Sequence, residues 1–232
     1  MARKKAEVNH TLNESAEQDN TQFFRVSVRN LVAFSIPEEV TWSFVTYSHL
    51  HEGSQVHSEI QSRHRAEGTY LSEVYLSYVY RSARYAVEIS GRADGIWELE
   101  DGAVIHEIKT TTLPLSEINE DFSEAHWAQG KCYAFMYAAG RNLDRITVRL
   151  TYSHRPVGGE KSFDRTYTFD ELQEFIKGLI RPYAAWAMSQ ARWRKVRDLS
   201  VKSLEFPFPA YREGQRLLAY NTYKCIQDGK RL

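Results

Sequence analysis

Three β-rich runs between residues 70 and 112 constrain the fold of this chain more than any other feature. The runs are LSEVYLSYVYR, RYAVEISGRADGIWEL and GAVIHEIKTT, and β-branched and aromatic residues recur in each of them as in a strand. Glu100-Asp101-Gly102 stands between the second and third runs and is a good tight-turn sequence. The sequence therefore predicts three strands, of which the last two form a hairpin.

Helical patterns precede these strands. The stretch FFRVSVRNLVAFSI brings the first apolar density, and its spacing suits a short helix over residues 28–34 that ends before Pro37. A second helix is expected within HLHEGSQVHSEIQSRH, with Leu50, Val56 and Ile60 as core contacts. Residues 1–22 are polar and are expected to form a disordered tail.

The pattern after the three strands alternates between helix and strand. A helix is expected from Ser123 to residue 139, where Gly140 can end it. RITVRLTYSH and SFDRTYTF form a candidate hairpin, and the capping box of Thr168 and Glu171 then begins a long helix that Pro182 is expected to kink or split. This order predicts an α/β or α+β fold with a central mixed sheet flanked by helices.

Composition and charge exclude several classes. The 232 residues carry a formal net charge of zero, so overall charge gives no sign of nucleic-acid binding, although a local basic groove can still exist. No apolar run approaches the roughly 20 residues of a membrane span, and no apolar segment follows the basic start MARKK as in a secretory signal. A cytoplasmic protein with reduced thiols at Cys132 and Cys225 is expected.

The stretch GRADGIWELEDGAVIHEIKTTT places three charges in the predicted hairpin. Glu107 and Lys109 are two residues apart and face the same side of their strand, and Asp94 can reach them if the strands twist or a bulge intervenes. Two nearby carboxylates need a neutralising partner, and Mg²⁺ binds one or two carboxylates together with water and phosphate. The alternative is an exposed edge on which Glu107 and Lys109 form an ion pair.

These residues resemble a known motif pair. GRADG followed by IHEIKTT is similar to the active-site motifs of the PD-(D/E)XK nuclease superfamily, here as Asp94 and Glu107-Ile108-Lys109. The RecB-like branch of that superfamily also has a helical Gln-x-x-x-Tyr motif, which HWAQGKCYAFMYA matches with Gln129 and Tyr133. The resemblance covers roughly residues 25–190 and implies a restriction-endonuclease-like core. Without it, Gln129 and Tyr133 would be a polar helix patch and a core tyrosine.

The resemblance also implies roles for individual residues. Asp94, Glu107, an upstream histidine that His57 matches, and the Ile108 carbonyl would hold Mg²⁺ or Mn²⁺. Lys109 would act on the attacking water, while Gln129 and Tyr133 would position the nucleic-acid backbone or the lysine. His126 would line the same groove, and Glu59 and Glu73 are weaker candidates for an accessory acid. Some members carry a four-cysteine iron–sulfur cluster, which is not expected in a chain with two cysteines.

The C-terminal segment resembles a different protein family. FPFPAYREGQ is similar to the entry to the helicase domain of XPD-type (Rad3-related) helicases, where the positions of Arg212 and Gln215 contact the adenine of ATP. Some bacterial helicases of that kind begin with a RecB-like nuclease domain, which SVRNLV and HWAQGKCYA also resemble. The chain has no G-x-x-x-x-G-K-[ST] loop, so no ATPase activity is expected of it. The alternative for residues 204–232 is a helix that packs on its own domain.

Together these features predict a nuclease domain over residues 23–203, followed at 204–232 by a linker and the first helix of a truncated helicase domain. The expected activity is metal-dependent hydrolysis of DNA, with single-stranded DNA or single-stranded ends as substrate, a helicase domain in the same longer polypeptide, and a role in DNA repair. ARWRKVR offers Arg194 as a further DNA contact, or else is a solvated helix end. The alternative function is a catalytically silent nucleic-acid-binding or docking module.

Overall fold

The computed structural model describes residues 21–36, 47–66, 68–155, 157–205 and 207–230. The chain divides into two compact units, Met1–Met188 and Ser189–Leu232. The strands of the first unit are β1 (Gln22–Ser27), β2 (Tyr70–Arg81), β3 (Tyr85–Leu99), β4 (Gly102–Thr111), β5 (Arg145–His154) and β6 (Glu160–Thr168). The helices are α1 (Val28–Ser35), α2 (Tyr47–Arg65), α3 (Glu124–Arg141), α4 (Phe169–Lys202), which continues into the second unit, and α5 (Gln215–Gln227), which lies wholly in it.

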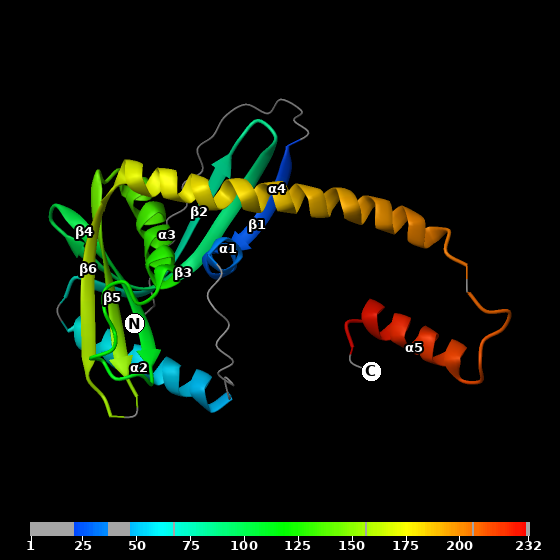
Figure 1. The fold of residues 1–232 in the computed structure, drawn as a ribbon, viewed down its shortest axis with the longest axis horizontal. Coiled ribbons are helices and arrows are strands. Elements are labelled where there is room, and N and C mark those ends of the chain that lie inside the picture. The colour runs from blue at the N-terminus through cyan, green and yellow to red at the C-terminus, as the bar shows by residue number, and fades with distance from the viewer. Residues whose placement is uncertain (1–20, 37–46, 67, 156, 206, 231–232) are drawn as a thin grey trace, which may run out of the picture. The chain divides into compact units, whose positions relative to one another are not determined.

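The predicted fold class is confirmed, because the described strands form a six-stranded mixed sheet flanked by helices, consistent with a restriction-endonuclease-like core (Figure 1). Strand β3 is its centre. Antiparallel β2 runs along one edge of β3 from Ala86 to Trp97. The other edge is shared, because parallel β1 pairs with residues 85–90 and antiparallel β4 pairs with residues 95–99. On that edge, residues 91–94 of β3 lie between the stretch that pairs with β1 and the stretch that pairs with β4.

Helices cover both faces of the sheet. Helices α1, α3 and the first turns of α4 share one large core with β1, β3 and β5, in which Leu31, Phe135 and Ile176 are almost fully buried. Helix α2 contacts β2, β3 and β4, and its Val56 and Ile60 pack against Ile108. Consecutive residues of a strand point to opposite faces. Ile108 therefore faces α2, whereas Glu107 and Lys109 face α3.

Strands β2 and β3 exchange faces at Glu73 and Asp94. Ala93 belongs to the core with α3, yet Gly95 lies against the ring of Tyr70, which contacts His64 of α2. On a regular strand, residues two apart share a face. The exchange is accommodated on β2 by Glu73, whose φ of 55° is left-handed. The twist or bulge that Asp94 needs in order to reach Glu107 is present at Asp94 itself.

Most of the predicted elements are found, with differences at their ends. Strand β1 was not predicted. Helix α3 continues past Gly140 to Arg141 and is capped by Asn142, whose φ is 53°, because asparagine also tolerates the left-handed conformation. Pro182 is predicted to kink or split the last helix. It does not split it, since α4 continues through Pro182 to Lys202, and the kink stays a prediction. The capping box is present, with Thr168 N donating to Glu171 Oε2 over 2.7 Å.

Two predictions fall largely on residues that the structure does not describe. Pro37 is outside the described residues, and so are residues 1–20 of the expected tail, while Gln22 opens β1. Among the helices that are described, none is long and apolar enough to span a membrane.

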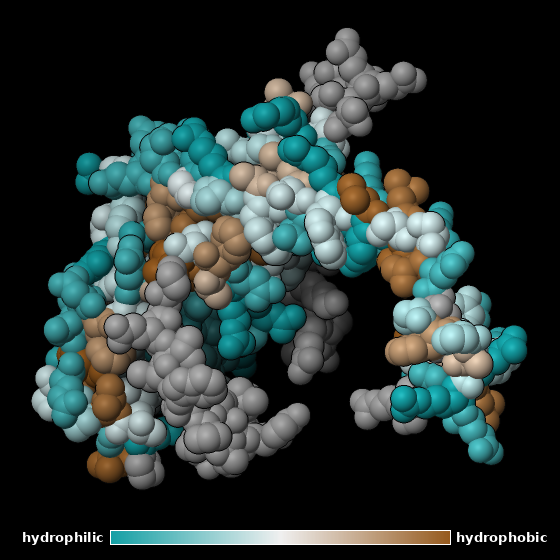
Figure 2. All heavy atoms as spheres, turned by 45° about the vertical axis from the view of Figure 1, so that its right-hand side comes forward, coloured by the Kyte–Doolittle hydropathy of each residue, from teal (hydrophilic) through white to brown (hydrophobic). Residues whose placement is uncertain are grey.

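The second unit contains the last turns of α4 and helix α5. Helix α5 begins after Gly214, whose φ of 74° is left-handed, and it has no buried residue. Exposed hydrophobic side chains occur on both helices, among them Val196, Leu199 and Leu217. Figure 2 shows hydrophobic side chains interspersed with hydrophilic ones at this surface.

Candidate active site

Asp94 connects the two strands of the hairpin through its side chain. The last regular pair between β3 and β4 is Gly95 with His106, and the same register places Asp94 level with Glu107. Asp94 Oδ2 accepts a hydrogen bond from Ile108 N over 2.8 Å. The carboxylate is thus held at the point where β4 leaves β3.

Glu107 is the most buried acid of the site. Lys109 Nζ donates a hydrogen bond to Glu107 Oε1 over 2.7 Å. Its other oxygen, Oε2, is buried and has no hydrogen-bond partner among the described residues. Burial raises the pKa of Glu107 to about 7, with Asp94 acting in the same direction and Lys109 opposing it. Burying a carboxylate whose oxygen has no hydrogen-bond partner costs free energy unless a cation neutralises the charge.

Lys109 lies between two acceptors. Its Nζ donates to Glu107 Oε1 and to Gln129 Oε1, each over 2.7 Å. Gln129 projects from α3, so the amine is fixed from a strand and a helix together. The side chain of Lys109 is 22% exposed, so it is largely shielded from water yet can still reach a substrate.

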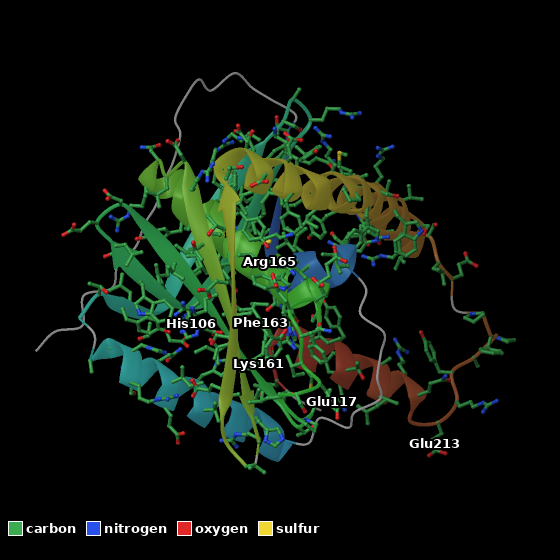
Figure 3. The ribbon with its side chains drawn as sticks, turned by 60° about the vertical axis from the view of Figure 1, so that its left-hand side comes forward. His106, Glu117, Lys161, Phe163, Arg165 and Glu213 are labelled. Atoms are coloured by element: carbon green, nitrogen blue, oxygen red, sulfur yellow. The ribbon has the colours of Figure 1, made fainter. Side chains whose placement is uncertain are left out.

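The segment that joins β4 to α3 is fixed by β6, and this places Gln129. Lys161 Nζ donates to the carbonyl oxygens of Leu115 and Ile118 over 3.1 and 2.6 Å. Arg165 pairs with Glu120 and lies 4.4 Å from the ring centre of Trp127, two residues before Gln129. Figure 3 shows Lys161, Phe163 and Arg165 along β6.

Helix α2 contributes His57 to the same cluster. His57 Nδ1 is 3.5 Å from Asp94 Oδ1. Burial lowers the pKa of His57, but the hydrogen bond to Asp94 and the charges of Asp94 and Glu107 outweigh burial, so its pKa is raised. Histidine, both carboxylates and lysine are therefore brought together from α2, β3 and β4.

Gln61 and Gly91 support the cluster and were not predicted from the sequence. Gln61 is one helical turn after His57 and donates through Nε2 to the Asp94 carbonyl oxygen over 2.9 Å and to Glu73 Oε1 over 3.0 Å. The spacing of four residues from His57 is the signal that could have found it. Gly91 is needed because a Cβ there would lie 2.9 Å from the ring of Tyr133.

Tyr133 lies with its ring over β3 at Gly91. It is 8% exposed, and it is hydrogen-bonded to the Arg92 backbone. Burial raises its pKa. The structure therefore gives Tyr133 a part in holding β3 two residues before Asp94.

The remaining candidates of the first unit lie at different distances from the cluster. His126 Nδ1 is 2.9 Å from the hydroxyl of Tyr152, the β5 residue that pairs with Lys109, so it is close to the lysine strand. Ile108 donates its N–H to Asp94, and the role of its carbonyl remains a prediction. Glu73 joins the cluster through Gln61, whereas Glu59 is exposed on α2 beside a shallow hollow.

Three candidates lie in the second unit. Arg194 is exposed on α4, next to Trp193. The guanidinium of Arg197 lies over the Trp193 ring. Arg212 N donates to Gln215 Oε1 over 3.1 Å at the start of α5. The roles of Arg194, Arg212 and Gln215 remain predictions.

His106 occupies the opposite face of β4. It is fully buried, and its ring nitrogens are 3.0 Å from the Tyr70 hydroxyl and 2.8 Å from Thr151 Oγ1. Burial lowers its pKa to about 3, so the ring is neutral. Figure 3 shows it within the sheet, where its two hydrogen bonds connect β2 to β5 across β4.

The donor set fits a hard divalent cation. Within the described part of the chain, no three His, Cys, Asp or Glu side chains form a ready-made metal cage. Mg²⁺ does not require one, since it usually keeps several waters and binds through one or two carboxylates. The open Oε2 of Glu107 and the nearby Asp94 carboxylate supply such oxygens.

No protein family model matches this chain, and no curated protein matches it. Among solved structures it is similar to the crystal structure of SSO0001, with 15% identity over 72% of this chain and 78% of that one and a TM-score of 0.46. It is also similar to an alkaline exonuclease from Laribacter hongkongensis, with 11% identity over 78% of this chain and 95% of that one and a TM-score of 0.43. At these levels of similarity, neither structure carries information about the chemistry of this chain.

Proposed function

We propose that the first unit is a metal-dependent nuclease domain that hydrolyses phosphodiester bonds in DNA. The observation that carries this proposal is the position of Lys109 Nζ, 2.7 Å from both Glu107 and Gln129, beside the open buried oxygen of Glu107. The resemblance of GRADG and IHEIKTT to the PD-(D/E)XK motifs supports the same assignment. An exposed ion pair on a sheet edge, the alternative from the sequence, does not bury a carboxylate to this degree.

Each residue has a proposed role. Asp94, Glu107, His57 and the Ile108 carbonyl would hold Mg²⁺ or Mn²⁺, and the bound cation would polarise a phosphoryl oxygen and acidify a water. Lys109 orients the attacking water or stabilises charge that develops on the phosphate. Gln129 holds the Lys109 amine in place, and Tyr133 holds β3 beside it. His126 and Arg194 are proposed DNA contacts.

The proposal includes a helicase domain in the same longer polypeptide. It rests on the resemblance of FPFPAYREGQ to helicase entry segments, with Arg212 and Gln215 as the adenine-contacting positions once such a domain is complete. The exposed apolar side chains of α5 suit a helix that belongs to a larger core.

The experiment is a cleavage assay with end-labelled single-stranded and duplex DNA in Mg²⁺, Mn²⁺ or EDTA. Cleavage that requires the metal and disappears in Lys109→Ala is the expected result, and product lengths would show the polarity. Salt-sensitive DNA binding without cleavage in either metal would instead support the silent binding module, which the intact Asp94, Glu107 and Lys109 argue against.

A further inference from the structure

A pocket of about 360 Å³ lies where β1 ends and α1 begins. Its volume is in the range of small-ligand sites. All of its lining residues belong to the first unit, and none of them belongs to the Asp94 cluster. The lining residues are Arg25, Val26, Ser27, Asn30, Phe34, Ser90, Tyr183 and Trp186.

Three aromatic rings form one wall of this pocket. The centre of the Phe34 ring is 5.5 Å from that of Tyr183 and 5.3 Å from that of Trp186, and the last two are 5.7 Å apart. Trp186 is 45% exposed and Phe34 39%. Helix packing alone does not require two large rings to face water, whereas nucleobases stack on such rings.

The other lining residues of the pocket are mostly polar. Ser27, Asn30 and Ser90 line it, and Arg25 stands at the rim with 79% of its side chain exposed. The Arg25 Nε donates to Glu88 over 2.8 Å, which leaves other N–H groups of the guanidinium for a phosphate. Aromatic faces beside a cation and hydroxyls match the chemistry of a nucleotide.

The pocket lies on the strand edge that leads to the active-site cluster. Ser27 and Ser90 form the last pair of β1 with β3, and β4 begins to pair at Gly95. Asp94 is four residues beyond Ser90, a distance of about 13 Å along a strand. Arg92 lies between Ser90 and Asp94 in the sequence and supplies a second positive charge, with 62% of its side chain exposed.

We propose that this pocket binds a nucleobase of single-stranded DNA, with the same strand crossing the Asp94, Glu107 and Lys109 cluster. The inference rests on the proposed nuclease function and deepens it, because it names a single strand with accessible bases as the substrate. A base in a duplex is paired and stacked, so it cannot lie against Trp186. The pocket therefore selects single-stranded ends or single strands.

The test combines removal of a ring from the protein with removal of bases from the DNA. Fluorescence anisotropy would measure binding of a fluorescein-labelled thymidine oligonucleotide of about ten nucleotides, within the usual footprint of such sites, and of an abasic strand of equal length. Ca²⁺ would replace Mg²⁺ to prevent cleavage. Trp186→Ala should weaken binding of the thymidine strand by about tenfold and leave binding of the abasic strand unchanged.

Two further variants control for folding and for loss of a ring elsewhere. Trp186→Phe keeps a stacking face and should retain most of the affinity. Tyr223→Ala removes an exposed ring on α5 and should change neither strand's affinity. Equal weakening of both strands by Trp186→Ala, or no weakening of either, would overturn the pocket proposal.

Cleavage of the same oligonucleotide in Mg²⁺ by the wild type separates this proposal from the proposed function. Cleavage together with unchanged base-dependent affinity in Trp186→Ala would leave the nuclease in place and remove the pocket. Base-dependent affinity that needs Trp186, without cleavage, would keep the pocket and remove the nuclease. No DNA binding by the wild type would overturn both.

Discussion

At the residue scale, Lys109, the proposed catalytic lysine, is held by its two acceptors, Glu107 and Gln129. Gln129→Leu removes one of them without adding bulk on α3, so the amine loses an orienting contact. We expect kcat for DNA cleavage to fall by about 10- to 100-fold while KM stays within about twofold, since the loss acts on transition-state positioning. Steady-state kinetics on a single-stranded substrate would measure this.

A different outcome would give Gln129 another role. If Gln129→Leu raises KM and leaves kcat unchanged, the glutamine binds DNA and does not position Lys109. Gln129→Glu provides the matched comparison, because it keeps an oxygen acceptor for the lysine amine.

The spacing of Asp94, Glu107 and Lys109 could be interpreted from the sequence because motifs in neighbouring strands are brought together by the hairpin. Gln129 could also be interpreted from the sequence, because it lies on the next helix along the chain. The spacing of Gln61 from His57 indicates its helix face, but its hydrogen bonds to Asp94 and Glu73 could not be found in this way, and neither could the ion pair of Arg92 with Glu73. Their contacts depend on how α2 crosses the sheet and on the exchange of faces at Asp94, and neither is written in local spacing.

At the element scale, α3 packs closely on β3 where Tyr133 meets Gly91. A Cβ at position 91 would lie 2.9 Å from the Tyr133 ring, so Gly91→Ala forces the helix or the strand to shift. We expect a loss of about 1–3 kcal/mol in the free energy of unfolding, as for other overpacked cores. Urea denaturation followed by circular dichroism would measure it.

The cost should depend on the size of the partner ring. Combined with Tyr133→Leu, Gly91→Ala should cost less than the sum of the two single changes, because the smaller side chain relieves the contact. Strict additivity in this double-mutant cycle would mean that Gly91 is required for its backbone and not for Tyr133.

The interior of α3 also predicts a difference between the two thiols. Cys132 is fully buried and burial raises its pKa to about 12, whereas Cys225 on α5 is partly exposed. Since the thiolate is the reactive form, iodoacetamide at neutral pH should modify Cys225 in the native protein and Cys132 only after unfolding. Peptide mass spectrometry would identify the sites, and rapid native modification of Cys132 would contradict the packing of α3.

Elements were predictable where local signals agree. The hairpin turn, the Thr168–Glu171 capping box and the apolar stripe of α4 are all local, and each is found. Strand β1 was not predicted because QFFRVS is short and because its pairing with β3 joins segments about 60 residues apart. Pro182 did not end α4, since packing of Ile176, Ile180 and Ala184 in the core outweighs one lost hydrogen bond.

At the scale of the whole molecule, the cluster of Asp94, Glu107, Lys109 and His57 lies entirely within the first unit. The second unit carries the helicase-like segment and Arg194, and the structure describes it separately. The proposed chemistry and the proposed helicase association therefore concern different parts of the chain. The boundary at residue 203 that the sequence indicates remains a prediction.

The central claim is that the buried Glu107 carboxylate takes part in cleavage. Its neutral isostere Glu107→Gln keeps an oxygen acceptor for Lys109 Nζ, which also retains Gln129 Oε1, so the fold should persist, as a thermal melt would show. Glu100→Gln, in the exposed turn of the same hairpin, is the matched control.

The decisive measurement is the single-turnover rate at which end-labelled single-stranded DNA is cut in Mg²⁺. The wild type and Glu100→Gln should cut at the same rate, and Glu107→Gln should be slower by at least about 100-fold. Equal rates for a folded Glu107→Gln and the wild type, or no cutting by the wild type in Mg²⁺ or Mn²⁺, would contradict this assignment.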